Sequence, residues 1–195
     1  MKKKVEAILN KNIEFIRNAV KKVGSNLSKD IMLAYSGITK FETGFKEEGL
    51  AELKQAVELN PTSDNLFMLA RSLGELPEGI EEAKVLYKRI LSTEPENFDA
   101  LYGLAWLTDN DEKALELYKR AAKIAPDNAA CHFEIGSILL NQRRYQEAIQ
   151  EYEKVHSLNN DIASKASLNI TTVSYTHLRA HETSLHLVCR LLLEK

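Results

Sequence analysis

The sequence predicts an all-α protein in which pairs of antiparallel helices repeat along the chain. Prolines recur at a nearly fixed interval, with Pro61 and Pro95 34 residues apart and Pro126 31 residues further on. Each proline follows a run whose apolar residues have the spacing of one helix face. Small and bulky residues also return at the same places in each interval. Such a pattern is expected when successive helix pairs pack on one another in the same way.

The second helix of each pair carries the strongest signal. A small residue is followed four positions later by a bulky one, and three positions after that by a further apolar residue. The small residues are Gly49, Ala83, Ala114 and Ala148, the bulky ones are Leu53, Tyr87, Tyr118 and Tyr152, and the third set is Ala56, Ile90, Ala121 and Val155. Residues three and four apart lie on one helix face. We therefore expect the small residues at helix crossings, with the bulky ones filling the space beside them.

The first helices follow the pattern less evenly. Their small position is held by Gly37, Ala105 and Gly136. The second repeat offers Arg71 there, unless a one-residue slip, absorbed by the turn 76–79, brings in Ala70. The third repeat is three residues short, and the aspartates and asparagine of its turn, 108–111, can cap the following helix.

This combination resembles the tetratricopeptide repeat (TPR) family, whose helix pairs show small residues at the crossing, an aromatic residue on the second helix and a closing proline. The segment His132–Asn160 carries the resemblance most completely, with Gly136, Ala148 and Tyr152 in register. The resemblance implies an all-α, right-handed α-solenoid of antiparallel helix pairs. We assign residues 28–172 to this array, as four helix pairs and the start of a fifth.

Residues 1–27 are expected to form an N-terminal capping helix. Apolar residues from Val5 to Val23 follow one helix face, the opposite face is rich in lysine and asparagine, and Gly24 is a natural stop. A terminal helix with a polar outer face is what repeat arrays need for solubility. A decayed earlier repeat is the alternative.

Residues 173–195 have none of the repeat marks. The stretches VSYTHLRAHET and LVCRLLLEK resemble one reading frame of a transposase-type sequencing adaptor. We therefore interpret the segment as a non-native, adaptor-derived tail that interrupts the natural sequence within its fifth repeat, and exclude it from the fold prediction.

Composition narrows the class of protein. The chain has 195 residues, of which 44% are hydrophobic and 28% charged, with a net charge of −2. Nothing in these values favours nucleic acid or membrane as a partner, and no apolar run approaches the length of a membrane span. Two cysteines indicate a reducing compartment. With polar residues interrupting any signal-peptide core after Met1, the expected location is cytoplasmic.

Candidate chemical motifs are weak. His181 and His186 are one residue too far apart for the H-E-x-x-H zinc spacing, and they fall in the tail. Cys131 and His132 are adjacent, so on a helix they point to different faces and are a poor nucleophile–base pair. No glycine-rich phosphate loop is present. We expect no enzyme activity, no metal and no cofactor.

The TPR resemblance implies an inner groove lined by the first helices. The groove positions of this sequence are largely apolar or aromatic and include Tyr102, Trp106, Phe133, Tyr35, Phe41, Met68, Ser137 and Leu140. The lysine, arginine and asparagine clamp with which some family members hold a terminal carboxylate is missing. Such a groove suits a helix or an extended peptide anchored by bulky side chains. The alternative is that some of these residues pack between neighbouring repeats.

The expected function is therefore a non-catalytic protein–protein interaction scaffold. Its partner would be a protein or peptide, with no nucleic acid, membrane or small-molecule substrate. The alternative is a regulatory or substrate-binding arm of a larger enzyme whose catalytic domain this sequence does not contain.

Overall fold

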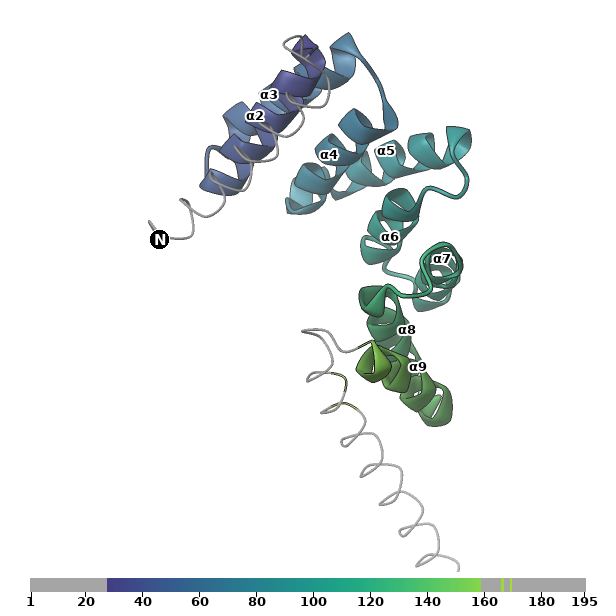
Figure 1. The fold of residues 1–195 in the computed structure, drawn as a ribbon. Coiled ribbons are helices and arrows are strands. Elements are labelled where there is room, and N and C mark those ends of the chain that lie inside the picture. The colour runs from purple at the N-terminus through teal and green to yellow at the C-terminus, as the bar shows by residue number, and fades with distance from the viewer. Residues whose placement is uncertain (1–27, 159–165, 167–168, 170–195) are drawn as a thin grey trace, which may run out of the picture. The chain divides into compact units, whose positions relative to one another are not determined.

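The protein is described by a computed structural model, which covers residues 28–158, 166 and 169. Regular structure in residues 28–158 is entirely helical, as predicted (Figure 1). The expected capping helix, residues 1–27, and the expected adaptor-derived tail, 173–195, lie outside the described residues. The chain divides into two compact units after Leu107.

The described residues of the first unit form two complete helix pairs and one further helix. In it α2 packs on α3, and α4 packs on α5. The first helices also lie side by side, since α4 contacts both α2 and α6. The elements are α2 (Lys29–Thr43), α3 (Lys46–Leu59), α4 (Ser63–Gly74), the 3-10 turn η1 (Pro77–Gly79), α5 (Ile80–Thr93) and α6 (Phe98–Trp106).

The second unit contains α7 (Asp111–Ile124), α8 (Ala129–Asn141) and α9 (Tyr145–Ser157). Here α8 packs on α7 and on α9. Asn110 caps α7, because its side-chain oxygen accepts a hydrogen bond from the backbone N–H of Lys113 at 2.9 Å. This confirms that the short turn of the third repeat can start the next helix directly.

The helix crossings confirm the predicted roles of small and bulky residues. Gly49 is buried, and the other eleven residues of the three rows are at most 4% exposed. A Cβ atom on Gly49 would lie 2.6 Å from the carbonyl oxygen of Gly37. A Cβ atom on Gly136 would lie 2.7 Å from Cε1 of Tyr152. At these crossings a methyl group has no room, which is why the positions hold the smallest residues.

The one-residue slip in the second repeat is also confirmed. Ala70 is fully buried, whereas Arg71 is exposed and pairs with Glu42 at 3.3 Å. The extra residue is taken up between α4 and α5 by the turn that contains η1. The crossing position is therefore held by Ala70, because burying the charged Arg71 side chain there without a partner would cost a large desolvation free energy.

Turn chemistry repeats along with the helices. Each of α3, α5 and α7 ends two residues before its proline, which cannot continue a helix. Gly44, between α2 and α3, has φ 105° and occupies the left-handed region. Arg143 holds the same place in the α8–α9 turn, seven residues after the small residue of the first helix, and has φ 60°. Glycine adopts this conformation without the steric cost that arginine carries.

Candidate functional site

The first helices of the first unit carry four of the predicted groove residues. Tyr35 lies on α2, Met68 on α4, and Tyr102 and Trp106 on α6. The first three are partly buried, and Trp106 is 58% exposed, although tryptophan is usually well covered in a folded protein. The three helices that carry them are neighbours, since α4 contacts both α2 and α6, and Tyr35 and Met68 line one pocket. We call Tyr35, Met68, Tyr102 and Trp106 the first-helix surface.

Phe41 does not contribute to this surface, so the expectation for it is wrong. Its side chain is 3% exposed and packs in the crossing of α2 with α3. A Cβ atom on Gly49 would lie 2.7 Å from the Phe41 backbone nitrogen, which shows how closely α3 approaches this turn of α2. The groove expectation was based on repeat position, which does not reveal that α3 covers the last turn of α2.

The remaining predicted residues lie on α8 of the second unit and are tied to α9. The ring of Phe133 packs against Tyr152, with 5.7 Å between centroids. The Ser137 hydroxyl donates to the Phe133 carbonyl oxygen at 2.9 Å and lies 3.2 Å from the Tyr152 hydroxyl. Leu140 is half-buried. Phe133 and Ser137 thus make contacts within the α8–α9 hairpin, as the alternative of packing residues predicts.

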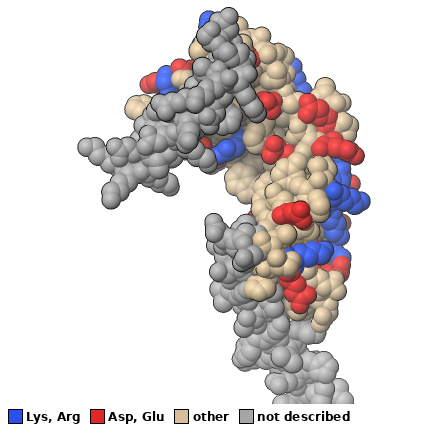
Figure 2. Space-filling view, in the orientation of Figure 1, with Lys and Arg blue, Asp and Glu red and all other residues tan. Residues whose placement is uncertain are grey.

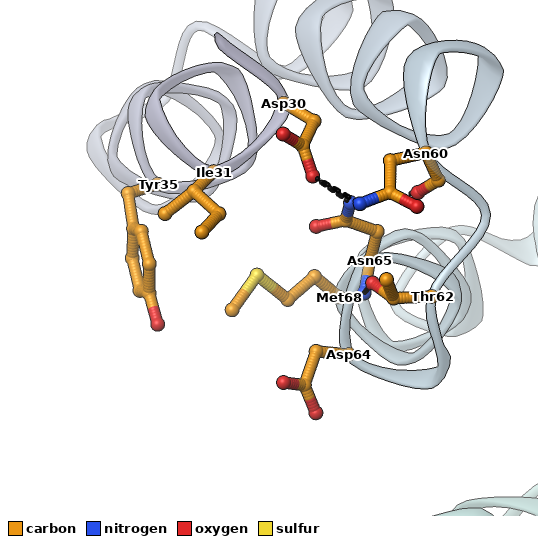
Figure 3. A pocket seen from close by; sticks show the side chains of 8 residues that line it. All are labelled: Asp30, Ile31, Tyr35, Asn60, Thr62, Asp64, Asn65 and Met68. Carbon is orange, nitrogen blue, oxygen red and sulfur yellow. Dashed lines mark hydrogen bonds between the residues drawn. The ribbon is translucent and has the colours of Figure 1, made fainter. Parts of the chain in front are cut away.

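A pocket of about 170 Å³ lies between α2 and α4. Ile31 and Met68 supply apolar side chains, and Tyr35 and Asp64 stand at one end of the pocket, from opposite helices (Figure 3). Its other lining residues are polar and lie around the start of α4 and the start of α2, namely Asp30, Asn60, Thr62 and Asn65. Among the described residues, the lining contains two carboxylates and no lysine or arginine.

The back of the pocket is a hydrogen-bonded cluster. The Asp30 carboxylate is 5% exposed and accepts hydrogen bonds from the Asn60 amide at 3.0 Å and the Asn65 amide at 3.2 Å (Figure 3). The Asn65 amide also donates to the Asn60 carbonyl oxygen at 2.8 Å. A hydrogen bond from the Ser28 side chain, together with those from the two asparagines, lowers the pKa of Asp30 despite its burial. Asp30 therefore stays ionised, compensated by amides and a hydroxyl.

The negative charge of Asp64 affects the pKa values of neighbouring groups on α2 and α6. Burial raises the pKa of Tyr35, and the negative charge of Asp64 adds to that shift. Desolvation likewise raises the pKa of Asp99 on α6, again with a contribution from Asp64. Among the described residues no hydrogen bond or ion pair holds the Asp64 carboxylate. The surface thus combines apolar side chains with negative charge.

Cys131 and His132 do not form a nucleophile–base pair. Cys131 is fully buried, and burial raises the pKa of its thiol to about 11, so the reactive thiolate is scarce at neutral pH. His132 Nδ1 lies 2.7 Å from Glu151 Oε2, and its Nε2 lies 2.9 Å from the carbonyl oxygen of Pro126. The imidazole therefore links α8 to α9 and to the turn after α7.

Sequence reasoning missed the polar cluster and the pocket it closes. Asp30 and Asn65 are one repeat apart and start two consecutive first helices. The available signal was the presence of Asn65 among apolar residues on a buried helix face, where an amide requires partners.

Across the described range no group of three or more histidine, cysteine or acidic residues is arranged to hold a metal ion. Within that range no helix has both the length and the apolar character of a membrane span.

Comparisons with known proteins agree with the helix pairs. Residues 112–160 match the family model for the tetratricopeptide repeat. No curated protein matches the chain. Among solved structures, MamA residues 41-end from Desulfovibrio magneticus RS-1 is similar with a TM-score of 0.68 at 17% identity, covering 86% of this chain and 96% of that one. The structure of MamA MSR-1 C2 is similar with a TM-score of 0.62 at 20% identity, covering 80% of this chain and 90% of that one. At these identities the likeness concerns the fold.

Proposed function

From the tetratricopeptide repeat fold that this chain adopts, we propose a non-catalytic scaffold that binds a peptide or helix of a partner protein on the first-helix surface. The observation that carries the proposal is the exposure of Trp106, at 58%, beside the partly buried Tyr102 on α6. Large apolar side chains at the surface gain free energy when a partner covers them. Tryptophan and tyrosine are also enriched among residues that dominate binding energy.

The shape and charge of the surface support a segment of protein as the partner. Three neighbouring first helices offer side chains at successive positions, as in recognition of a helix or an extended peptide. In Figure 2 the basic side chains lie mainly along one edge, with acidic side chains above, beside and below them, so the visible basic side chains form no unbroken stripe. A basic stripe is the usual electrostatic footprint of nucleic-acid binding.

A random peptide library panned against the full chain tests the proposal. Selected peptides are expected to contain aromatic or aliphatic anchors. Trp106→Ala should then raise their dissociation constants about 30-fold, since truncating an anchor of this kind costs about 2 kcal/mol or more. Val85 is 63% exposed on the second helix α5 and provides the matched control, because Val85→Ala should leave binding unchanged.

Circular dichroism separates binding from folding. Both variants should keep the helical signal and melting temperature of the parent chain. Loss of helical signal in Trp106→Ala in proportion to the loss of binding would show that Trp106 is a packing residue. Failure to select any peptide, or equal binding by the parent and Trp106→Ala, would refute the proposed function.

A further inference from the structure

The pocket between α2 and α4 has an unbalanced charge. Asp30 is ionised and buried, and the described groups that donate hydrogen bonds to it are amides and a hydroxyl, which carry no positive charge. Asp64 adds a second carboxylate, with no hydrogen bond or ion pair from the described part of the chain. No lysine or arginine is among the described residues that line the pocket. Two negative charges at a small concave site attract a cation, and the low-dielectric walls strengthen that attraction.

The same pocket also has apolar walls. Ile31 projects from α2 and Met68 from α4, and both side chains point into the space between the helices (Figure 3). A free metal ion or ammonium group would gain nothing from these walls. A long aliphatic stem that ends in a positive charge would use both features, since lysine and arginine bury their methylene groups against apolar surface while keeping the charged end at a polar site.

We propose that this pocket receives a lysine or arginine side chain of the bound segment, with the methylene groups against Ile31 and Met68 and the cationic end beside the Asp64 carboxylate. Tyr35 lines the same pocket from the other helix, and the charge of Asp64 contributes to the raised pKa of its hydroxyl (Figure 3). This inference rests on the proposed function, because the pocket and the first-helix surface share Tyr35 and Met68. It adds that the partner carries a basic residue beside its apolar anchors.

Methionine methyl groups provide a local measurement on the full chain. The chain has three methionines, and of these Met68 lines the pocket while Met32 is 54% exposed on α2 and is absent from the lining. N-acetyl-lysine methylamide added to protein with 13C-labelled methionine methyls should shift the Met68 signal saturably and leave Met32 unchanged. N-acetyl-norleucine methylamide, which has the same four-carbon stem without the charge, should produce a far smaller shift.

Two aspartate variants test the charge. Asp64→Asn should raise the dissociation constant of the lysine probe about fivefold, the upper range for an exposed ion pair. Asp111 also lies in the first turn of a helix, α7, so Asp111→Asn controls for helix-terminus effects and should not change binding. Equal binding of the norleucine and lysine probes, or unchanged lysine binding in Asp64→Asn, would overturn the inference.

The two proposals fail in different ways. If the peptides selected by panning bind through Trp106 but have no basic residue in common, the inference about the pocket is overturned and the proposed function stands. If the lysine probe shifts Met68 and depends on Asp64 while no peptide is selected, the proposed function is refuted and the pocket assignment is supported.

Discussion

Replacing Gly49 with alanine tests the close crossing of α2 and α3 most directly. The added Cβ atom would lie 2.6 Å from the Gly37 carbonyl oxygen and 2.7 Å from the Phe41 backbone nitrogen. Both are backbone atoms, so no side-chain rotation can relieve the contacts and the helices must separate. Separation weakens the packing of Leu53 and Phe41, which are 0% and 3% exposed.

The expected magnitude follows from two opposing terms. Overpacking a well-filled site costs about 1–3 kcal/mol. Alanine in a helix interior is favoured over glycine by about 1 kcal/mol, which offsets part of that cost. Because both close contacts of the added Cβ are with backbone atoms, the overpacking cost should lie in the upper half of its range, at about 2–3 kcal/mol. The net loss in free energy of unfolding should then be about 1–2 kcal/mol, corresponding to a fall in melting temperature of about 2–8 °C for a chain of this size.

Urea and thermal unfolding of Gly49→Ala, followed by circular dichroism, measure this loss. Gly74→Ala is the matched control. Its added Cβ atom would meet Leu107 side-chain carbons at 3.2 and 3.3 Å, and a side chain can move by a few tenths of an ångström. The control should stay within about 0.5 kcal/mol of the parent. If Gly49→Ala were as stable as Gly74→Ala or more so, the reasoning about the crossing would be refuted.

Three further predictions concern single contacts. Arg143→Gly should raise the free energy of unfolding by about 0.5–1 kcal/mol in urea titrations, since glycine removes the left-handed strain; a loss would contradict this. Asn65→Ala should cost about 1–3 kcal/mol by leaving the Asp30 carboxylate short of a donor, and a double-mutant cycle with Asp30→Ala should show coupling. Burial opposes ionisation of Glu151, but hydrogen bonds from Lys154 and His132 hold its pKa below 4.5. The ionised carboxylate of Glu151 therefore contributes its full stabilisation above pH 4.5, and this stabilisation is lost as the pH falls through the lowered pKa of the folded state. Glu151→Gln should flatten the acid side of a profile of unfolding free energy against pH. An unchanged profile would contradict this role of Glu151.

The arrangement of helix pairs could be predicted because its cause is local and recurs. Ala83 and Tyr87 are four residues apart on one helix, so their shared face follows from helix geometry alone. The same pattern in other repeats reinforced the register. The sequence alone does not decide whether Ala70 or Arg71 holds the small position, because the two are neighbours, and burial in the folded protein selects Ala70.

The candidate site was less predictable because it depends on contacts between repeats. Phe41 holds a groove position by repeat number, yet the close approach of α3 buries it. The link from Asp30 to Asn65 joins residues on different helix pairs, and neither side chain indicates its partner by spacing within a helix. Whether Trp106 is covered depends on its neighbours in space, so its 58% exposure could be learned only from the structure.

The separation of crossing residues from outward-facing ones has a consequence for how such a chain diverges over evolutionary time. Tyr87 and Tyr152 sit on second helices and hold their hairpins together, while Trp106 projects from a first helix. Substitutions at positions like that of Trp106 can accumulate with little effect on folding, whereas those at the crossings are removed by selection for stability. Lineages descended from one ancestor can thus acquire different ligands while retaining the same helix pairs.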